Sequence, residues 1–126
     1  MSRVLVDTSV WIDFFNGKPE VNSLNELIDV NQVYINDLIK VELVPSLLLR
    51  KENEVIDLIN QLESIPLTID WNEIAQMQYS NLKKGINKVG IPDLIIIQNV
   101  LQNDLVLFSR DKHFELMKKM FNYRLY

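Results

Sequence analysis

The chain has 126 residues, of which 48% are hydrophobic and 24% are charged, so it can form one domain with a substantial core. It contains no cysteine and only one histidine, which excludes disulfide bonds, thiolate metal sites and zinc sites built from several imidazoles. The formal net charge of −4 does not suit a protein that binds nucleic acid through a basic surface. The apolar runs are far shorter than the ~20 residues that cross a bilayer, so we expect a cytoplasmic protein without a membrane segment.

The N-terminal half of the chain predicts short strands separated by helices. Runs of aliphatic and β-branched residues without polar alternation indicate buried strands at residues 3–6 and 33–35. Apolar residues at helical spacing indicate helices at residues 10–15, 20–30, 37–49 and 52–62. Thr8 and Ser9 are suited to cap the first helix and Asn36 the third. Pro45 lies inside the third helix and is expected to kink or divide it.

The C-terminal half continues the same alternation. Strands are predicted at residues 65–69, 105–108 and 123–126, and helices at residues 71–84, 92–102 and 111–120. Pro66 indicates an edge or entry position for its strand, Asp70 a helix cap, and Pro92 the first turn of a helix. Strands that alternate with helices predict an α/β fold with a mainly parallel sheet covered on both faces.

Four acidic residues lie where such a fold would gather them: Asp7, Glu42, Asp93 and Asp111. Asp7 ends the first strand, and Asp111 follows the strand at residues 105–108 after two residues. Ligands of an open parallel sheet bind beyond the carboxyl ends of its strands, so these acids are expected to converge. Converging carboxylates repel one another, and a hard divalent cation held by oxygen ligands relieves that repulsion. The pattern therefore favours a metal-dependent hydrolase.

Each acid taken alone also has a purely structural interpretation. The first and last suit helix capping or an Asx turn, and Asp93 lies in a first helical turn, where the helix dipole favours acids. In the structural interpretation, Glu42 lies at the edge of an apolar stripe and reaches water, where Lys40 or Arg50 could pair with it. Only the joint pattern favours a site. Setting the four acids aside leaves 13 acidic against 13 basic residues, which is compatible with a phosphate-containing substrate.

This pattern resembles the PIN-domain family of metal-dependent ribonucleases, and most of all the small VapC-type toxins of toxin–antitoxin pairs. The resemblance rests on four segments spread over nearly the whole chain: residues 4–13, 36–43, 91–96 and 107–114. The third segment departs from the family pattern, because Ile97, Gln98 and Asn99 follow it where small residues are usual. In the second, Pro45 replaces the residues that usually continue the helix.

The resemblance implies one PIN-like domain over residues 1–126, built as a three-layer α/β/α sandwich. It also implies one or two Mg²⁺ or Mn²⁺ ions and endonucleolytic hydrolysis of RNA. A small cognate antitoxin and a homodimer are the implied partners. Two alternatives stay open: a PIN-type nuclease of RNA processing that is not a toxin, and a non-catalytic module in which the acids bind a structural cation.

The resemblance also assigns roles to residues. Asp7 and Asp93 match the direct metal ligands, and Glu42 and Asp111 match further catalytic acids that bind the metal, in part through water. Ser9 and Thr8 match a hydroxyl position beside the first acid, which positions water or substrate. Arg110 is expected at the rim of the site, where it would contact RNA phosphates. His113 is interpreted as a helix-surface or packing residue.

Overall fold

The computed structural model describes residues 2–126, and a five-stranded sheet runs through its middle. All strand pairs are parallel, and the strand order is β3-β2-β1-β4-β5. The strands are β1 (Val4–Val6), β2 (Val33–Ile35), β3 (Glu63–Ser64), β4 (Val106–Phe108) and β5 (Arg124–Leu125). The predicted parallel sheet is confirmed.

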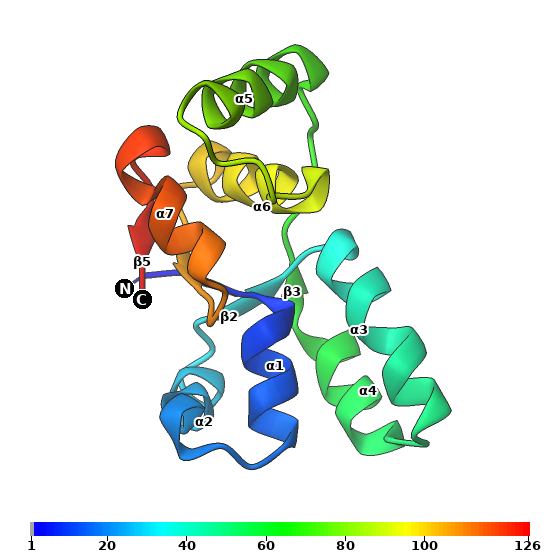
Figure 1. Ribbon diagram of the computed structural model, residues 1–126. Helices are drawn as coiled ribbons and strands as arrows, with labels where there is room; N and C mark the ends of the chain where they lie inside the picture. The colour runs from blue at the N-terminus through cyan, green and yellow to red at the C-terminus, as the bar shows by residue number, and fades with distance from the viewer. Residues whose placement is uncertain (1) are drawn as a thin grey trace.

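Helices cover both faces of the sheet. They are α1 (Thr8–Phe15), η1 (a 3-10 helix, Pro19–Val21), α2 (Ser23–Asp29), α3 (Asp37–Leu49), α4 (Asn53–Gln61), α5 (Trp71–Lys83), α6 (Ile91–Gln102) and α7 (Lys112–Phe121). Helices α1 to α4 lie on one face and α5 to α7 on the other, which confirms the predicted α/β sandwich (Figure 1). This division follows from right-handed crossovers that run in opposite directions from the centre of the sheet. Within the described residues, no helix is long and apolar enough to span a membrane.

The two central strands, β1 and β4, determine where a site can form. Every residue of both strands is buried, as expected for parallel strands covered on both faces. The chain leaves β1 toward β2, whereas β4 lies on the opposite side of β1. The connections that follow these two strands therefore lead to opposite sides of the sheet, and ligands of open parallel sheets bind at the carboxyl edge where such connections separate.

Two predicted helices differ in detail from the structure. The helix predicted at residues 20–30 is divided into η1 and α2, because the amide of Asn22 bonds to the Pro19 carbonyl and ends the first of them. Conversely, α3 continues through Pro45, which does not divide it. Pro45 has no amide to donate to the carbonyl of residue 41, and Val41 lies on the exposed side of the helix, where the loss of one helical hydrogen bond is best tolerated.

The strand predicted at residues 65–69 is wrong, because strand β3 is limited to Glu63–Ser64. Amide side chains of α6 bond to the extended backbone that follows, from Gln98 to Asp70, from Asn99 to Pro66 and from Gln102 to Thr68. Gln98 both accepts from the Asp70 amide and donates to the Asp70 carbonyl, at 3.1 Å each, as a neighbouring strand would. Gln98 and Asn99, two of the residues that depart from the family motif, therefore hold the segment after β3 against α6.

Candidate metal centre

Asp7 connects the two central strands to the site. Its backbone amide donates to the Phe108 carbonyl of β4 at 2.9 Å, so strand pairing fixes its position. Its side chain is only 6% exposed, and Oδ2 accepts hydrogen bonds from the Ser9 hydroxyl (2.8 Å), the Ser9 amide (3.4 Å) and the Ser109 hydroxyl (3.0 Å). Asp7 thus caps α1, and these donors stabilise a buried carboxylate. Within the described residues, no hydrogen bond reaches Oδ1.

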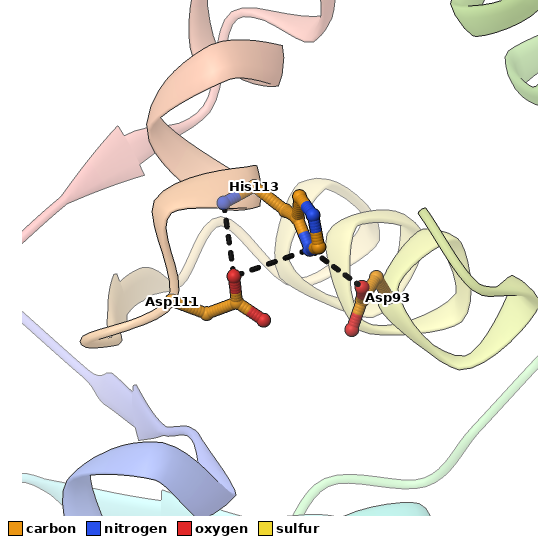
Figure 2. Close-up of side chains that lie close together, drawn as sticks. All are labelled: Asp93, Asp111 and His113. Atoms are coloured by element: carbon orange, nitrogen blue, oxygen red, sulfur yellow. Dashed lines mark hydrogen bonds and ion pairs between the residues drawn. The ribbon is translucent and has the colours of Figure 1, made fainter. Parts of the chain in front are cut away.

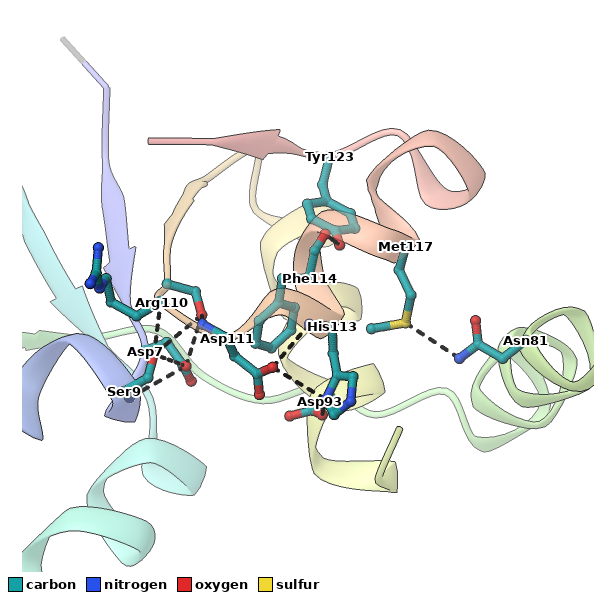
Figure 3. A network of polar contacts seen from close by, with 11 residues as sticks. Asp7, Ser9, Asn81, Asp93, Arg110, Asp111, His113, Phe114, Met117 and Tyr123 are labelled. Carbon is teal, nitrogen blue, oxygen red and sulfur yellow. Dashed lines mark hydrogen bonds and ion pairs between the residues drawn. The ribbon is translucent and has the colours of Figure 1, made fainter. Parts of the chain in front are cut away.

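The hydroxyls of Ser9 and Ser109 bind the loop after β4 to the end of β1 and the start of α1, and Figure 3 shows Ser9 beside Asp7 and Arg110. The Ser9 hydroxyl accepts from the Arg110 amide at 2.9 Å, and the Ser109 hydroxyl accepts from the Asp111 amide at 3.0 Å. Asp111 in turn caps α7 by accepting from the His113 amide at 2.9 Å. The loop after β4 is therefore held so that Asp111 lies at the start of α7, beside the end of β1.

Glu42 reaches the same region from α3. Its side chain is exposed, and the Thr8 hydroxyl donates to its Oε1 at 3.1 Å. Partial burial and the nearby charge of Asp7 raise the pKa of Glu42, and the hydrogen bond from Thr8 opposes that rise. The exposed side chain of Glu42 reaches water. Among the described residues it forms no ion pair, so pairing with Lys40 or Arg50 is not seen.

Asp93 lies in the first turn of α6, where the charges of the other three acids and of His113 act on its carboxyl group. Burial, together with the nearby charges of Asp111 and Asp7, raises the pKa of Asp93 from its ordinary 3.8 to about 6. Glu42 adds a smaller effect in the same direction, whereas His113 opposes it. All four predicted acids therefore lie close enough for their charges to interact, although they come from four different parts of the chain.

His113 lies on the surface of α7 with its side chain 36% exposed, as the sequence suggested, but it also faces two of the acids. Its Nδ1 lies 3.2 Å from Oδ1 of Asp111 and 3.9 Å from Oδ2 of Asp93 (Figure 2). These three side chains offer ligand atoms within 4.8 Å of one another. Two carboxylates and one imidazole form a donor set that fits a divalent cation. The sequence carried one signal for this position, since a histidine two residues after a capping acid lies in the same first helical turn.

Arg110 points in a direction that the sequence did not predict. Its guanidinium pairs with Asp13 of α1 at 3.3 Å and with Glu20 of η1 at 3.9 Å. Asp13 also pairs with Lys18 at 3.6 Å. The side chain is thus engaged by acids outside the four-acid cluster, and a role in positioning RNA stays a prediction.

The fold and the site together define an α/β sandwich with an acidic centre at the carboxyl edge of a parallel sheet. The chain belongs to the PIN-domain family, whose match covers residues 4–120. The family predicted from the sequence motifs is therefore confirmed. Among curated proteins, no sequence relative matches the chain.

Solved structures share this fold over almost their whole length. VapBC2 from Rickettsia felis, bound to a DNA fragment from its promoter, has a TM-score of 0.75 and 18% identity over 98% of this chain and 96% of its own. DNA-bound VapBC from Salmonella typhimurium has a TM-score of 0.74 and 19% identity over 100% and 98%. A toxin–antitoxin complex from Klebsiella pneumoniae has a TM-score of 0.61 and 21% identity over 86% and 87%. At these identities the likeness shows the fold, and it agrees with the predicted resemblance to VapC-type proteins.

Proposed function

We propose that this protein is a metal-dependent endoribonuclease and the toxin of a type II toxin–antitoxin pair. One observation carries the proposal: Asp93, Asp111 and His113 offer ligand atoms within 4.8 Å of one another, and the Ser109 hydroxyl joins Asp7 to the amide of Asp111. Such a cluster needs a cation to balance it. Membership of the PIN-domain family supports a nuclease, and the motif resemblance supports RNA as its substrate.

In this proposal Asp7 and Asp93 hold Mg²⁺ or Mn²⁺ directly, while Glu42 and Asp111 act as further acidic ligands or bind through water. The ion would lower the pKa of a bound water and neutralise charge that develops on the phosphate. The serine hydroxyls beside Asp7 orient its carboxylate, and Thr8 orients Glu42. Such outer partners position the ligands of metal sites.

The proposed partners follow from the relatives. The Klebsiella pneumoniae relative is described as a toxin–antitoxin complex, which supports a small cognate antitoxin for this chain as well. A homodimer and a cytoplasmic location are proposed from the motif resemblance alone. Arg110 would contact RNA only if its ion pairs with Asp13 and Glu20 open.

The nuclease is tested by incubating purified protein with total RNA and Mn²⁺ or Mg²⁺, and then mapping the cut ends. We expect metal-dependent cleavage that Asp7→Asn and Asp93→Asn abolish. Asp104→Asn is the matched control, because Asp104 is 94% exposed and pairs only with Arg124 in the described part of the chain. Protein that binds metal and cleaves no RNA would contradict the proposal, as would cleavage that survives both site variants.

The toxin role needs a separate experiment. Expression of the wild-type chain should arrest bacterial growth, and Asp93→Asn should relieve that arrest. Co-expression of a small open reading frame next to the gene should relieve it as well. RNA cleavage in vitro without growth arrest would instead indicate a nuclease of RNA processing.

A further inference from the structure

We propose that His113 is a direct ligand of the divalent ion bound by Asp93 and Asp111, and that its nitrogen shifts the preference of the site from Mg²⁺ toward Mn²⁺. The inference rests on the metal centre of the proposed function. It adds a fifth ligand residue to the four acids, and it explains why an imidazole faces two carboxylates at this edge of the sheet.

The spacing of the three side chains suits adjacent ligands of one ion. Metal–oxygen and metal–nitrogen bonds of roughly 2.1 Å place neighbouring octahedral ligands about 3 Å apart. Nδ1 of His113 lies 3.2 Å from the nearest oxygen of Asp111 and 3.9 Å from that of Asp93. The arrangement therefore needs only a small adjustment around an ion.

The backbone holds the imidazole in this place. The amide of His113 donates to Oδ1 of Asp111, so the histidine lies in the first turn of the helix that the acid caps. The side chains of Asp93, Asp111 and His113 are 23%, 35% and 36% exposed. Partial exposure leaves room for the water ligands that complete the shell of such an ion.

Nδ1 is the ring atom of His113 that faces both carboxylates, so it is the atom placed to bind an ion between them. Ligation requires the neutral tautomer with its hydrogen on Nε2.

The nitrogen donor has a consequence for metal choice. Mg²⁺ prefers oxygen ligands and keeps several waters, whereas imidazole is a better ligand for transition metals. A site with two carboxylates and one imidazole should therefore favour Mn²⁺ over Mg²⁺ more strongly than one with carboxylates alone.

His113 is the single histidine of the chain, so labelling histidine with ¹⁵N in untagged protein marks one imidazole. We expect a ¹⁵N coupling in pulsed electron paramagnetic resonance spectra of bound Mn²⁺, absent from unlabelled protein. Titration with Mg²⁺ should also move the ¹⁵N resonances of the ring. Mn²⁺ that binds without this coupling would overturn the inference, and this test needs no variant that might fail to fold.

A variant measures the preference. Loss of even an outer partner weakens metal sites roughly 10- to 100-fold, so His113→Gln should weaken Mn²⁺ binding by at least about tenfold in calorimetry, and Mg²⁺ binding less. Lys112→Gln, in the same turn, should leave the ratio of the two affinities unchanged. An unchanged ratio in His113→Gln would also overturn the inference. Imidazole coupling without RNA cleavage would refute the nuclease and keep the ligand, whereas cleavage without coupling would refute the ligand alone.

Discussion

At the scale of single residues, Asp93 shows how a converging acidic cluster affects the folded chain. Its pKa of about 6 in the folded protein lies above the ordinary value of 3.8. Folded protein without metal therefore holds this proton more tightly than unfolded protein does. The resulting stabilisation is complete below about pH 4 and is lost as the pH rises through about 6.

This gives a prediction for protein stripped of metal by a chelator. Between pH 4 and pH 7, the wild type should lose stability relative to Asp93→Asn, which carries no titrating group at this position. Scanning calorimetry of both proteins across this range measures the difference between their melting temperatures. Parallel curves would contradict the prediction. The comparison cancels the titration of shared residues whose charges do not act on Asp93.

Ser109 is the residue that joins two of the acids. Its hydroxyl donates to Asp7 and accepts from the amide of Asp111, so Ser109→Ala leaves both groups without this partner. We expect a loss of about 1–3 kcal/mol in the free energy of unfolding, measured with urea. Ser46→Ala, at an exposed position of α3, should change it by less than about 0.5 kcal/mol. Equal effects of the two substitutions would show that the hydroxyl bridge contributes little.

At the scale of elements, α6 has two roles: it forms the core of one helical layer, and its side chains form hydrogen bonds with the extended backbone after β3. Its residues Leu94 to Val100 are all buried, including two amide side chains. Asn99 accepts from Asn36 and donates to the Pro66 carbonyl, at 3.0 Å each, and so connects the cap of α3 to the segment after β3. A buried amide of this kind is tolerated only because its partners satisfy it.

The substitution Asn99→Leu tests that connection. It should lower the free energy of unfolding by about 1–3 kcal/mol, because the Pro66 carbonyl and the Asn36 amide lose their partner. Gln102→Leu removes a comparable bond to Thr68 at an exposed position, where water replaces it, and should cost clearly less. Urea unfolding of both variants gives the comparison. A cost for Asn99→Leu no larger than for Gln102→Leu would contradict this account of α6.

Local signals explain which elements the sequence could predict. The start of α3 was predictable because Asn36 caps it, and that of α5 because Asp70 does the same. The structure of residues 65–69 was not predictable, because an extended segment that bonds to side chains has the same hydrophobic pattern in its sequence as a strand. The difference lies in hydrogen bonds to residues about 30 positions later, such as the bond from Gln98 to Asp70.

The candidate centre was predictable to a similar extent. The four acids were recognisable because each follows a strand or lies on a helix within a short family motif. The approach of His113 to Asp93 and Asp111 was not predictable, because a single histidine on a helix usually lies on the surface without such partners. It depends on how the starts of α6 and α7 meet, which no local pattern encodes. The ion pairs of Arg110 with α1 and η1 likewise depend on tertiary packing.

At the scale of the whole molecule, metal binding should stabilise the fold. A ligand that binds only the folded state at 100 times its dissociation constant adds about 2.7 kcal/mol. Millimolar Mg²⁺ or Mn²⁺ should therefore raise the melting temperature of the wild type, and Asp93→Asn should weaken that response. Asp104→Asn should respond as the wild type does. A melting temperature that millimolar metal leaves unchanged would count against the site.

The pairing of β1 with β4 has a consequence for synthesis of the protein. Val4 pairs with Val106, and Asp7 meets Ser109 about a hundred positions later in the chain. A nascent chain on the ribosome therefore carries its first acid long before the strand and serines that complete the centre. If the protein cleaves RNA as proposed, the nascent chain cannot do so until the last fifth of the chain has emerged from the ribosome, because the site is incomplete before then.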